Sequence, residues 1–244
     1  MGNLLLPNLG LVTVRQVAEG VFNHAFVSDK IIESRVTLSN KGIAFVFPLY
    51  IYPTRLKEPN SESDILPKRV ANVNPSVLKD FELKIGRIVS PEQLVDYVYA
   101  VLNSPRYRGK FAEFLKLDFP RIPLPSDRVH FDKLVQLGHE LIGLHLEHQP
   151  VDGKIQFDVQ GSNLVEAVKR VGDKVFLNAT QYFDGISDDL WGFEIGGYRT
   201  LEKWLKSRRG LTLDSRDIEH YARIAGIVRR SLKLMKEIDS ALEL

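Results

Sequence analysis

The sequence has 244 residues, of which 44% are hydrophobic and 26% charged, as is typical of a folded protein that buries a sizeable core. Its net charge is only +2, so any affinity for a polyanion must come from the distribution of its cations. The absence of cysteine excludes disulfides, thiolate zinc sites and a cysteine nucleophile, and no apolar run reaches the roughly 18 residues of a membrane-spanning helix. We expect a cytoplasmic protein that makes no membrane contact.

Residues 1–52 show the pattern of short β-strands. Residues 11–14 and 21–27 are β-branched and aromatic runs separated by a turn. Residues 42–52 (GIAFVFPLYIY) are almost continuously apolar, which predicts a strand buried on both faces, with Pro48 at a bulge or a sheet edge. Polar side chains at or near the ends of these strands either contact base edges of a nucleic acid or form hydrogen bonds to loops. They are Arg15, Gln16, Asn23 and His24.

Residues 53–76 form a long, polar, proline-rich loop, a kind of segment that is commonly functional in compact domains. Its candidate phosphate-binding cations are Arg55, Lys57, Lys68 and Arg69. Further on, Glu82 and Lys84 have the Glu-x-Lys spacing of metal-dependent nucleases, but no partner aspartate follows a preceding strand. We therefore favour a solvated helix and expect no metal site.

Ser90 and Pro91 predict the start of a helix, and its apolar face ends near Asn103. A basic segment follows without any acid, and its cations either contact phosphates or coat a solvated helix. They are Arg106, Arg108 and Lys110. Prolines in residues 119–125 then predict an extended strap, because proline removes a backbone donor and fixes φ.

A long helix is predicted over about Asp127–His148, since leucines at alternating spacings of three and four form a coiled-coil-like seam. The second half of this helix carries His139, His145 and His148. His145 lies six residues after His139, not four, so these two cannot share one helix face as a helical zinc motif requires, and we expect the histidines to face solvent.

Strands are predicted again over 154–159 and 174–178. The residues that follow could hydrogen-bond to base edges or stack on bases, and they are Thr180, Gln181 and Tyr182. After an acidic piece comes a basic one, in which the cations suit a phosphate backbone or simply coat a helix. They are Arg199, Lys203, Lys206, Arg208 and Arg209. Trp204, between them, is expected in the core.

The last helix is predicted over about Ser215–Leu242, with a second apolar seam that Asp239 interrupts. We expect the two seamed helices to pack together antiparallel or to dock on a larger partner. The chain then divides into a β-rich and helical part (1–126), a long helix (127–150), a second β-containing part with a basic helix (151–213) and a final helix (214–244). These elements predict an α+β fold.

The catalytic motifs that a sequence can reveal are missing. There is no Asn-Pro-Pro-Tyr-type motif or glycine-rich cofactor loop for methyl transfer, no phosphate-binding loop of an ATP motor and no Gly-x-Ser-x-Gly turn of a hydrolase. We expect no catalytic centre and no cofactor.

Long segments in order along nearly the whole chain resemble a known family. They include VYAVLNSPRYRGKFAEFLKLDFPRIPLP (98–125), LGHELIGLHLEH (137–148), TQYFDGISDDLWGFEIGGYRTLEKWLKSRRG (180–210), and near the start VTVRQ, FNHAFVSD and GIAFVFPLYIYP. These segments resemble the C-terminal specificity domain of type ISP restriction–modification enzymes. The strap is also similar to target-recognition domains of type I specificity subunits.

The resemblance implies a domain that reads double-stranded DNA and presents the target adenine to an adenine-N6 methyltransferase. In that family, methyltransferase, translocase and nuclease modules precede this domain, so its partners would act in cis or in trans. Three hypotheses follow: a DNA reader, a docking module that binds a methyltransferase through the long helices, and a nuclease based on Glu82 and Lys84. We favour the first.

Overall fold

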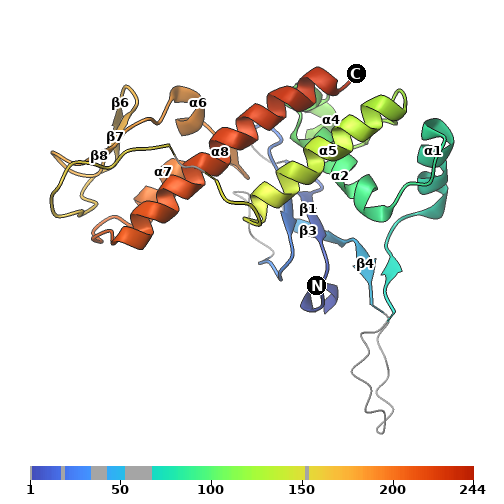
Figure 1. Ribbon diagram of the computed structural model, residues 1–244, viewed down its shortest axis with the longest axis horizontal. Coiled ribbons are helices and arrows are strands. Elements are labelled where there is room, and N and C mark those ends of the chain that lie inside the picture. Colours follow the sequence, from blue (N-terminus) through green and yellow to red (C-terminus); the bar gives the residue numbers. More distant parts are fainter. Residues whose placement is uncertain (1, 18–19, 34–42, 53–67, 152–153) are drawn as a thin grey trace, which may run out of the picture.

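The computed structural model describes residues 2–17, 20–33, 43–52, 68–151 and 154–244. Helices and small antiparallel sheets build this part of the chain (Figure 1), which confirms the predicted α+β class. After a short 3-10 helix (Gly2–Leu5), the strands are β1 (Gly10–Val14), β2 (Ala25–Ser28), β3 (Ala44–Pro48), β4 (Tyr50–Ile51), β5 (Val70–Ala71), β6 (Lys169–Val171), β7 (Lys174–Phe176), β8 (Tyr182–Phe183), β9 (Glu194–Ile195) and β10 (Tyr198–Arg199). The helices are α1 (Pro75–Ile85), α2 (Pro91–Asn103), α3 (Pro105–Lys110), α4 (Ala112–Leu117), α5 (Arg128–His145), α6 (Asp188–Trp191), α7 (Thr200–Lys206) and α8 (Ser215–Ala241).

Two hydrophobic cores divide the described residues into two lobes. The first lobe comprises the elements from β1 to α5, and the second lobe comprises those from β6 to α7. The long helix α8 runs diagonally between them in Figure 1 and contributes to both cores. Its first half buries Tyr221 and Val228 in the second lobe, and its second half buries Leu234 and Ile238 in the first. One continuous helix therefore sets the spacing of the lobes.

The first lobe contains a three-stranded antiparallel sheet with β1 in the centre and β2 and β3 beside it. Pro48 ends β3, whose pairing in the described sheet is with β1, so the predicted edge position is confirmed. The prediction that residues 42–52 are buried on both faces is wrong. Phe45 and Phe47 are each 43% exposed, although both rings pack edge-on against the Phe119 ring.

Helix α2 begins as predicted at Ser90, whose side chain and Gln93 form a reciprocal capping box. Its buried face packs on α5, and the two helices cross in very close contact. A Cβ at Gly138 of α5 would lie 1.9 Å from the carbonyl oxygen of Asp96 in α2. Only a glycine lets the two backbones approach this closely.

Helices α5 and α8 pack antiparallel, which confirms that prediction. His130 near the start of α5 contacts Glu243 at the end of the chain, with Nε2 and Oε1 2.9 Å apart. Glu147, just after α5, contacts Arg223 in the first half of α8 at 3.1 Å. The leucine seam of α5 is buried in the first core, as predicted. That apolar stripe is therefore covered within this chain.

The expectation that His139, His145 and His148 face solvent is wrong for His145. Its Nδ1 lies 2.6 Å from the Tyr99 hydroxyl in α2, and its Nε2 lies 2.9 Å from Ser231 Oγ in α8. Ser231 donates its own proton to the Ile227 carbonyl, so it accepts from His145 Nε2–H, and Nδ1 accepts from Tyr99. Burial, and then the charge of Arg108, lower the pKa of His145 to about 4. This neutral ring thus ties three helices together.

Asp239, the residue that interrupts the apolar seam of α8, has a structural role. Asp239 accepts hydrogen bonds from the Ser104 hydroxyl and from the backbone N–H of Arg106, at 3.1 Å for the latter. Both donors belong to the start of α3. A carboxylate at a helix N-terminus satisfies free N–H groups and interacts favourably with the helix dipole, so Asp239 fixes α3 to α8.

The second lobe packs β6, β7 and β8 and helices α6 and α7 against the first half of α8 (Figure 1). The predicted strand at 174–178 is confirmed as β7, whereas the one predicted at 154–159 is wrong. That segment forms only an isolated bridge from Gln156 to Asp184. Its alternating apolar residues Ile155 and Phe157 pack on the core without a strand partner. No helix of the described ranges is long and apolar enough to cross a membrane.

Candidate nucleic-acid interface

A basic groove lies along α7 and the hairpin before it. The hairpin of β9 and β10 turns at Gly196 and Gly197, which both have the positive φ that such a two-residue turn requires. The turn carries Tyr198 to the edge of a groove of about 550 Å³. The charged residues that line this groove are Arg199, Lys203, Lys206, Glu194 and Glu202.

The cations of this groove are held by weak, exposed contacts. Lys206 Nζ lies 2.7 Å from Glu202 Oε1, Arg199 Nε lies 3.7 Å from Glu194 Oε1, and the Lys203 ammonium lies 3.0 Å from the centre of the Tyr198 ring. Exposed ion pairs contribute only about 0–1 kcal/mol each to stability. A phosphate oxygen can therefore replace a carboxylate as partner at little cost.

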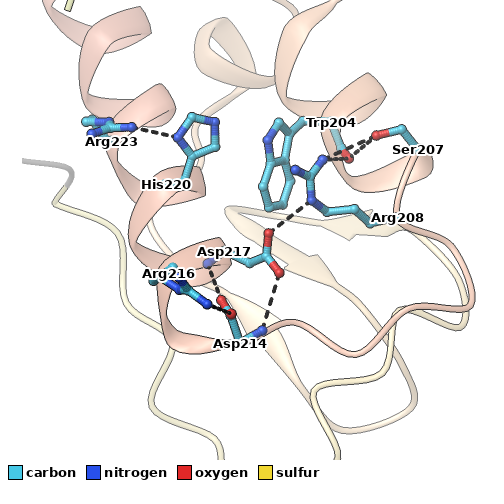
Figure 2. A network of polar contacts seen from close by, with 8 residues as sticks. All are labelled: Trp204, Ser207, Arg208, Asp214, Arg216, Asp217, His220 and Arg223. Atoms are coloured by element: carbon cyan, nitrogen blue, oxygen red, sulfur yellow. Dashed lines mark hydrogen bonds and ion pairs between the residues drawn. The ribbon is translucent and has the colours of Figure 1, made fainter.

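The turn after α7 is fastened by Arg208 (Figure 2). Its guanidinium lies 3.5 Å from the centre of the Trp204 ring, and its Nε donates to Asp217 Oδ1 at 3.3 Å. Asp217 and Asp214 form the capping box that begins α8. Arg208 thus joins α7 to α8, a structural role in place of the predicted phosphate contact. Trp204 is only partly buried, at the margin of the second core.

Arg209, in contrast to the neighbouring Arg208, is exposed. Its Nε donates to the Glu166 carbonyl oxygen at 3.0 Å. A guanidinium has five N–H donors, more than this one bond uses. Gly210 completes the turn with a φ of 82°, which a residue with a side chain rarely adopts.

The three predicted base-contacting residues around β8 have different environments. Thr180 is exposed at the turn between β7 and β8, where Asn178 Oδ1 accepts its N–H at 3.1 Å. Tyr182 is partly buried, and the Lys174 ammonium donates to its hydroxyl at 3.0 Å. Gln181, between them, is 0% exposed and points inward.

Gln181 connects the 159–163 loop to the turn at Asn178 through its amide. Nε2 donates to the Val159 carbonyl at 2.9 Å and to Asn163 Oδ1 at 2.8 Å, while Oε1 accepts from the Asn163 N–H and from Asn178 Nδ2. Every donor and acceptor of this amide is therefore engaged inside the protein. A side chain so placed supports the loops and is not available to a base.

Gln181→Ala is expected to lower the free energy of unfolding by about 2–4 kcal/mol, because it leaves buried amide partners without hydrogen bonds. Urea denaturation measures the change. Thr180→Ala, at the adjacent exposed position, is the control and should change stability by less than about 0.5 kcal/mol. An unchanged stability of the Gln181 variant would contradict the supporting role.

The four strand-end candidates of the first lobe make contacts within the protein. Arg15 Nε donates to Asp118 Oδ1 at 2.8 Å, and Gln16 Nε2 donates to the Leu117 carbonyl at 3.3 Å, although both residues are exposed. Asn23 is buried and accepts the N–H groups of Gly196 and Gly197, which joins the first lobe to the β9–β10 hairpin. His24 is buried, and burial together with the charge of Arg108 lowers its pKa to about 4.

The candidate cations of the first lobe are scattered. Arg108 points inward and donates to the Leu102 carbonyl and to Asn103 Oδ1, and burial lowers its pKa to about 10. Arg69 lies over the Tyr50 ring at 3.9 Å. Exposed cations are Lys68, Arg106 and Lys110. Arg55 and Lys57 lie outside the described residues.

The sequence matches the family model of the Type ISP C-terminal specificity domain over residues 1–237. The chain belongs to this family. A comparison with curated proteins found no match.

The solved structures of similar fold are much longer chains than this specificity domain. The ATP-dependent Type ISP restriction-modification enzyme LlaBIII bound to DNA has a TM-score of 0.74 at 19% identity, over 96% of this chain and 16% of that chain. The DrdV–DNA complex has a TM-score of 0.73 at 20% identity, over 95% of this chain and 24% of that chain. A nuclease-deletion mutant of the Type ISP restriction-modification enzyme LlaGI, in complex with a DNA substrate mimic, has a TM-score of 0.63 at 22% identity. The match covers 97% of this chain and 18% of that chain. The specificity domain thus spans a quarter or less of these chains.

The specificity domain also has an apolar hollow of about 530 Å³ that the sequence did not reveal. Tyr107 and Leu115 line it together with residues 117–123, which run from the end of α4 into the strap. Phe114 is 73% exposed and Leu117 67% exposed at this hollow, large values for apolar side chains. The strap was predicted as extended, and this is confirmed, but only folding brings it opposite α4.

The nuclease hypothesis receives no geometric support from the described part of the domain. Glu82 lies on α1, and its Oε1 accepts the Val89 N–H at 3.2 Å. Lys84 is exposed on the same helix. Within the described ranges no group of three or more His, Asp or Glu side chains is placed to hold a metal ion.

Proposed function

We propose that this specificity domain reads a sequence in double-stranded DNA and positions it for an adenine-N6 methyltransferase module, in cis or in trans, in the cytoplasm. Translocase and nuclease modules would belong to the same enzyme, and the domain itself would contribute recognition without catalysis. Family membership supports the proposal. The observation in this chain that carries it is the groove of exposed, replaceable cations on α7, in the same lobe as a turn whose tip, Thr180, is polar and exposed.

The residues divide by accessibility into two roles. The proposed phosphate contacts are the exposed cations Arg199, Lys203, Lys206 and Arg209, with Lys68, Arg106 and Lys110 as further contacts from the first lobe. The proposed base contacts at the second lobe are Thr180 and Tyr182. Phosphate contacts set the register of the protein on DNA, and base contacts select the sequence.

Selection of bound fragments from a randomised duplex library at low salt tests this function. An enriched short motif is the expected result. Retention without enrichment would contradict sequence reading and leave a backbone binder. Absence of retention would contradict autonomous DNA binding altogether.

Lys203→Ala with Lys206→Ala is expected to weaken binding to all duplexes alike. Each lost phosphate contact lowers the slope of log affinity against log salt by about 0.9, so the double variant should lose about 2 units of slope. The control is Lys79→Ala with Lys84→Ala, which removes two exposed lysines from α1. Equal slopes for both double variants, measured by fluorescence anisotropy, would contradict the placement of the phosphate backbone on α7.

A second function, docking onto a methyltransferase, is favoured by one observation. The seams of the long helices are covered within the chain, so the predicted docking through those helices is not available. The apolar hollow between α4 and the strap is open instead, with Phe114 and Leu117 exposed. Apolar surfaces of this kind commonly mark protein interfaces. This function and DNA reading can occur in the same domain.

A further inference from the structure

Three loops meet at one end of the second lobe: residues 159–163, 178–181 and 208–213. Backbone hydrogen bonds join the first loop and the residues just after it to the third loop. The Leu213 N–H donates to the Asn163 carbonyl at 3.0 Å, and the Gly210 N–H donates to the Val165 carbonyl at 2.8 Å. The second loop is joined to the end of the first by Asn178 Nδ2, which donates to the Leu164 carbonyl at 3.1 Å. We call this surface the loop end.

The loop end is rigid for reasons that can be traced to single residues. The buried amide of Gln181 binds both the 159–163 loop and the 178–181 turn. Gly161 is required beside it, since a Cβ there would lie 2.6 Å from the Gln181 side chain. Asn163 adopts a φ of 56°, which asparagine tolerates better than most residues. The third loop is held by Arg208 between Trp204 and Asp217 (Figure 2).

This rigid support presents polar side chains outward. Gln160, Ser162 and Thr180 are exposed, and no hydrogen bond of the Gln160 side chain is found among the described residues. Side-chain amides and hydroxyls are the groups that recognise base edges in the major groove, with glutamine suited to adenine. Arg209 is exposed on the third loop of the same surface. The loop end thus combines base-reading chemistry with a cation for the adjacent phosphate.

The strand ends of the first lobe lack this combination. Asn23 and His24 are buried, and the Asn23 side chain is occupied by the β9–β10 turn. The side chains of Arg15 and Gln16 donate hydrogen bonds to the end of α4 and to the residue that follows it, before the strap. Reading bases with them would require breaking contacts that shape the apolar hollow.

We propose that the loop end is the base-reading surface of the domain, with Gln160 and Thr180 at base edges and Arg209 on a neighbouring phosphate. This deepens the proposed function and rests on it. Because recognition groups work best when their supports are rigid, the buried Gln181 amide acts as the positioning residue for both readers. The groove on α7 then supplies further phosphate contacts along the same lobe.

Selection from the randomised duplex library, carried out with full-length variants, tests this inference. Gln160→Ala with Thr180→Ala should lose the preference at one or two adjacent base pairs and weaken binding to the best site by about tenfold or more, with an unchanged salt slope. Arg209→Ala should keep the motif and lower the salt slope by about 1. Gln16→Ala, an exposed glutamine of the first lobe, should keep both motif and slope.

The outcomes separate this inference from the function on which it rests. If the unaltered domain enriches no motif, sequence reading itself fails, and the inference fails with it. If it enriches a motif that survives the Gln160 and Thr180 double variant, or that changes with Gln16→Ala, reading occurs elsewhere and only the loop-end inference is overturned. Circular dichroism melting of each variant identifies a loss of binding that follows from unfolding.

Discussion

Gly138→Ala is expected to destabilise the protein by about 3 kcal/mol or more, a large effect for the addition of one methyl group. The new Cβ would lie 1.9 Å from the Asp96 carbonyl oxygen and 2.7 Å from its carbonyl carbon, and both are backbone atoms of α2. Neither can move without displacing the helix. Since α2 and α5 supply half of the buried residues of the first core, the lobe would have to repack around a wider crossing. Urea denaturation at equilibrium measures the effect.

Gly143→Ala, in the same helix, is the matched control. Its Cβ would meet only the end of the flexible Gln149 side chain, which can turn away. Replacing a helical glycine by alanine otherwise stabilises by about 0.5–1 kcal/mol, so this variant should be neutral or slightly more stable. Equal stability of the two variants would show that the helices do not cross as closely as described.

Acid is expected to destabilise the protein through His145. The pKa of this ring is about 4 in the folded state and 6.5 in its ordinary state. Above the ordinary pKa both states are neutral and the ring contributes no pH dependence. As pH falls below 6.5, the unfolded chain takes up a proton that the folded one refuses, so stability decreases until the folded pKa is reached. The loss amounts to at most about 3 kcal/mol for this one group.

The free energy of unfolding, measured by urea denaturation between about pH 7 and about pH 4, checks this expectation. His145→Gln should be less stable at neutral pH, because it disturbs the bonds to Tyr99 and Ser231, but should show a shallower decline with acid. His148→Gln, which changes an exposed histidine just beyond the helix, is the control. An equally steep decline in the His145 variant would contradict its role.

Two other groups contribute to the same pH range with opposite signs. Burial and the charge of Arg108 lower the pKa of His24 to about 4, so His24 adds to the acid destabilisation. Burial raises the pKa of Asp96 to about 6, against the opposing effect of His139. Its folded carboxyl takes up a proton before the unfolded one does, so Asp96 adds stability as pH falls below 6. The comparison between variants, rather than the total slope, therefore isolates His145.

Local sequence patterns were sufficient to predict the long helices. The capping box at Ser90 and the leucine seam of α5 predict helices close to their observed bounds, because caps and apolar periodicity act within a few residues. The same reasoning failed at residues 154–159. Alternating apolar residues there favour a strand, but a strand also needs a partner along its length, which this segment lacks beyond one bridge.

The candidate site was predictable only in part. Charge spacing pointed to the basic piece around α7, and the structure leaves Arg199, Lys203 and Lys206 exposed there. Residue type could not separate Arg208 from Arg209, or Gln181 from Thr180. The first of each pair is engaged by partners within the protein and the second is exposed. The partners Asp217 and Asn163 lie nine and 18 residues away in the sequence, and only folding brings them into contact.

By itself, the sequence determined the α+β class, the long helices and their seams, and the family, because these depend on local periodicity, capping and the order of long segments. The tertiary structure alone decided which polar side chains remain available to a ligand. Folding buries Gln181 and Asn23 and stacks Arg208 on Trp204. It also places Asp239 at the N-terminus of α3 and forms the apolar hollow beside the strap. The physical reason is that a polar group is satisfied by whatever the folded chain brings within about 3 Å of it, and sequence spacing does not encode that distance.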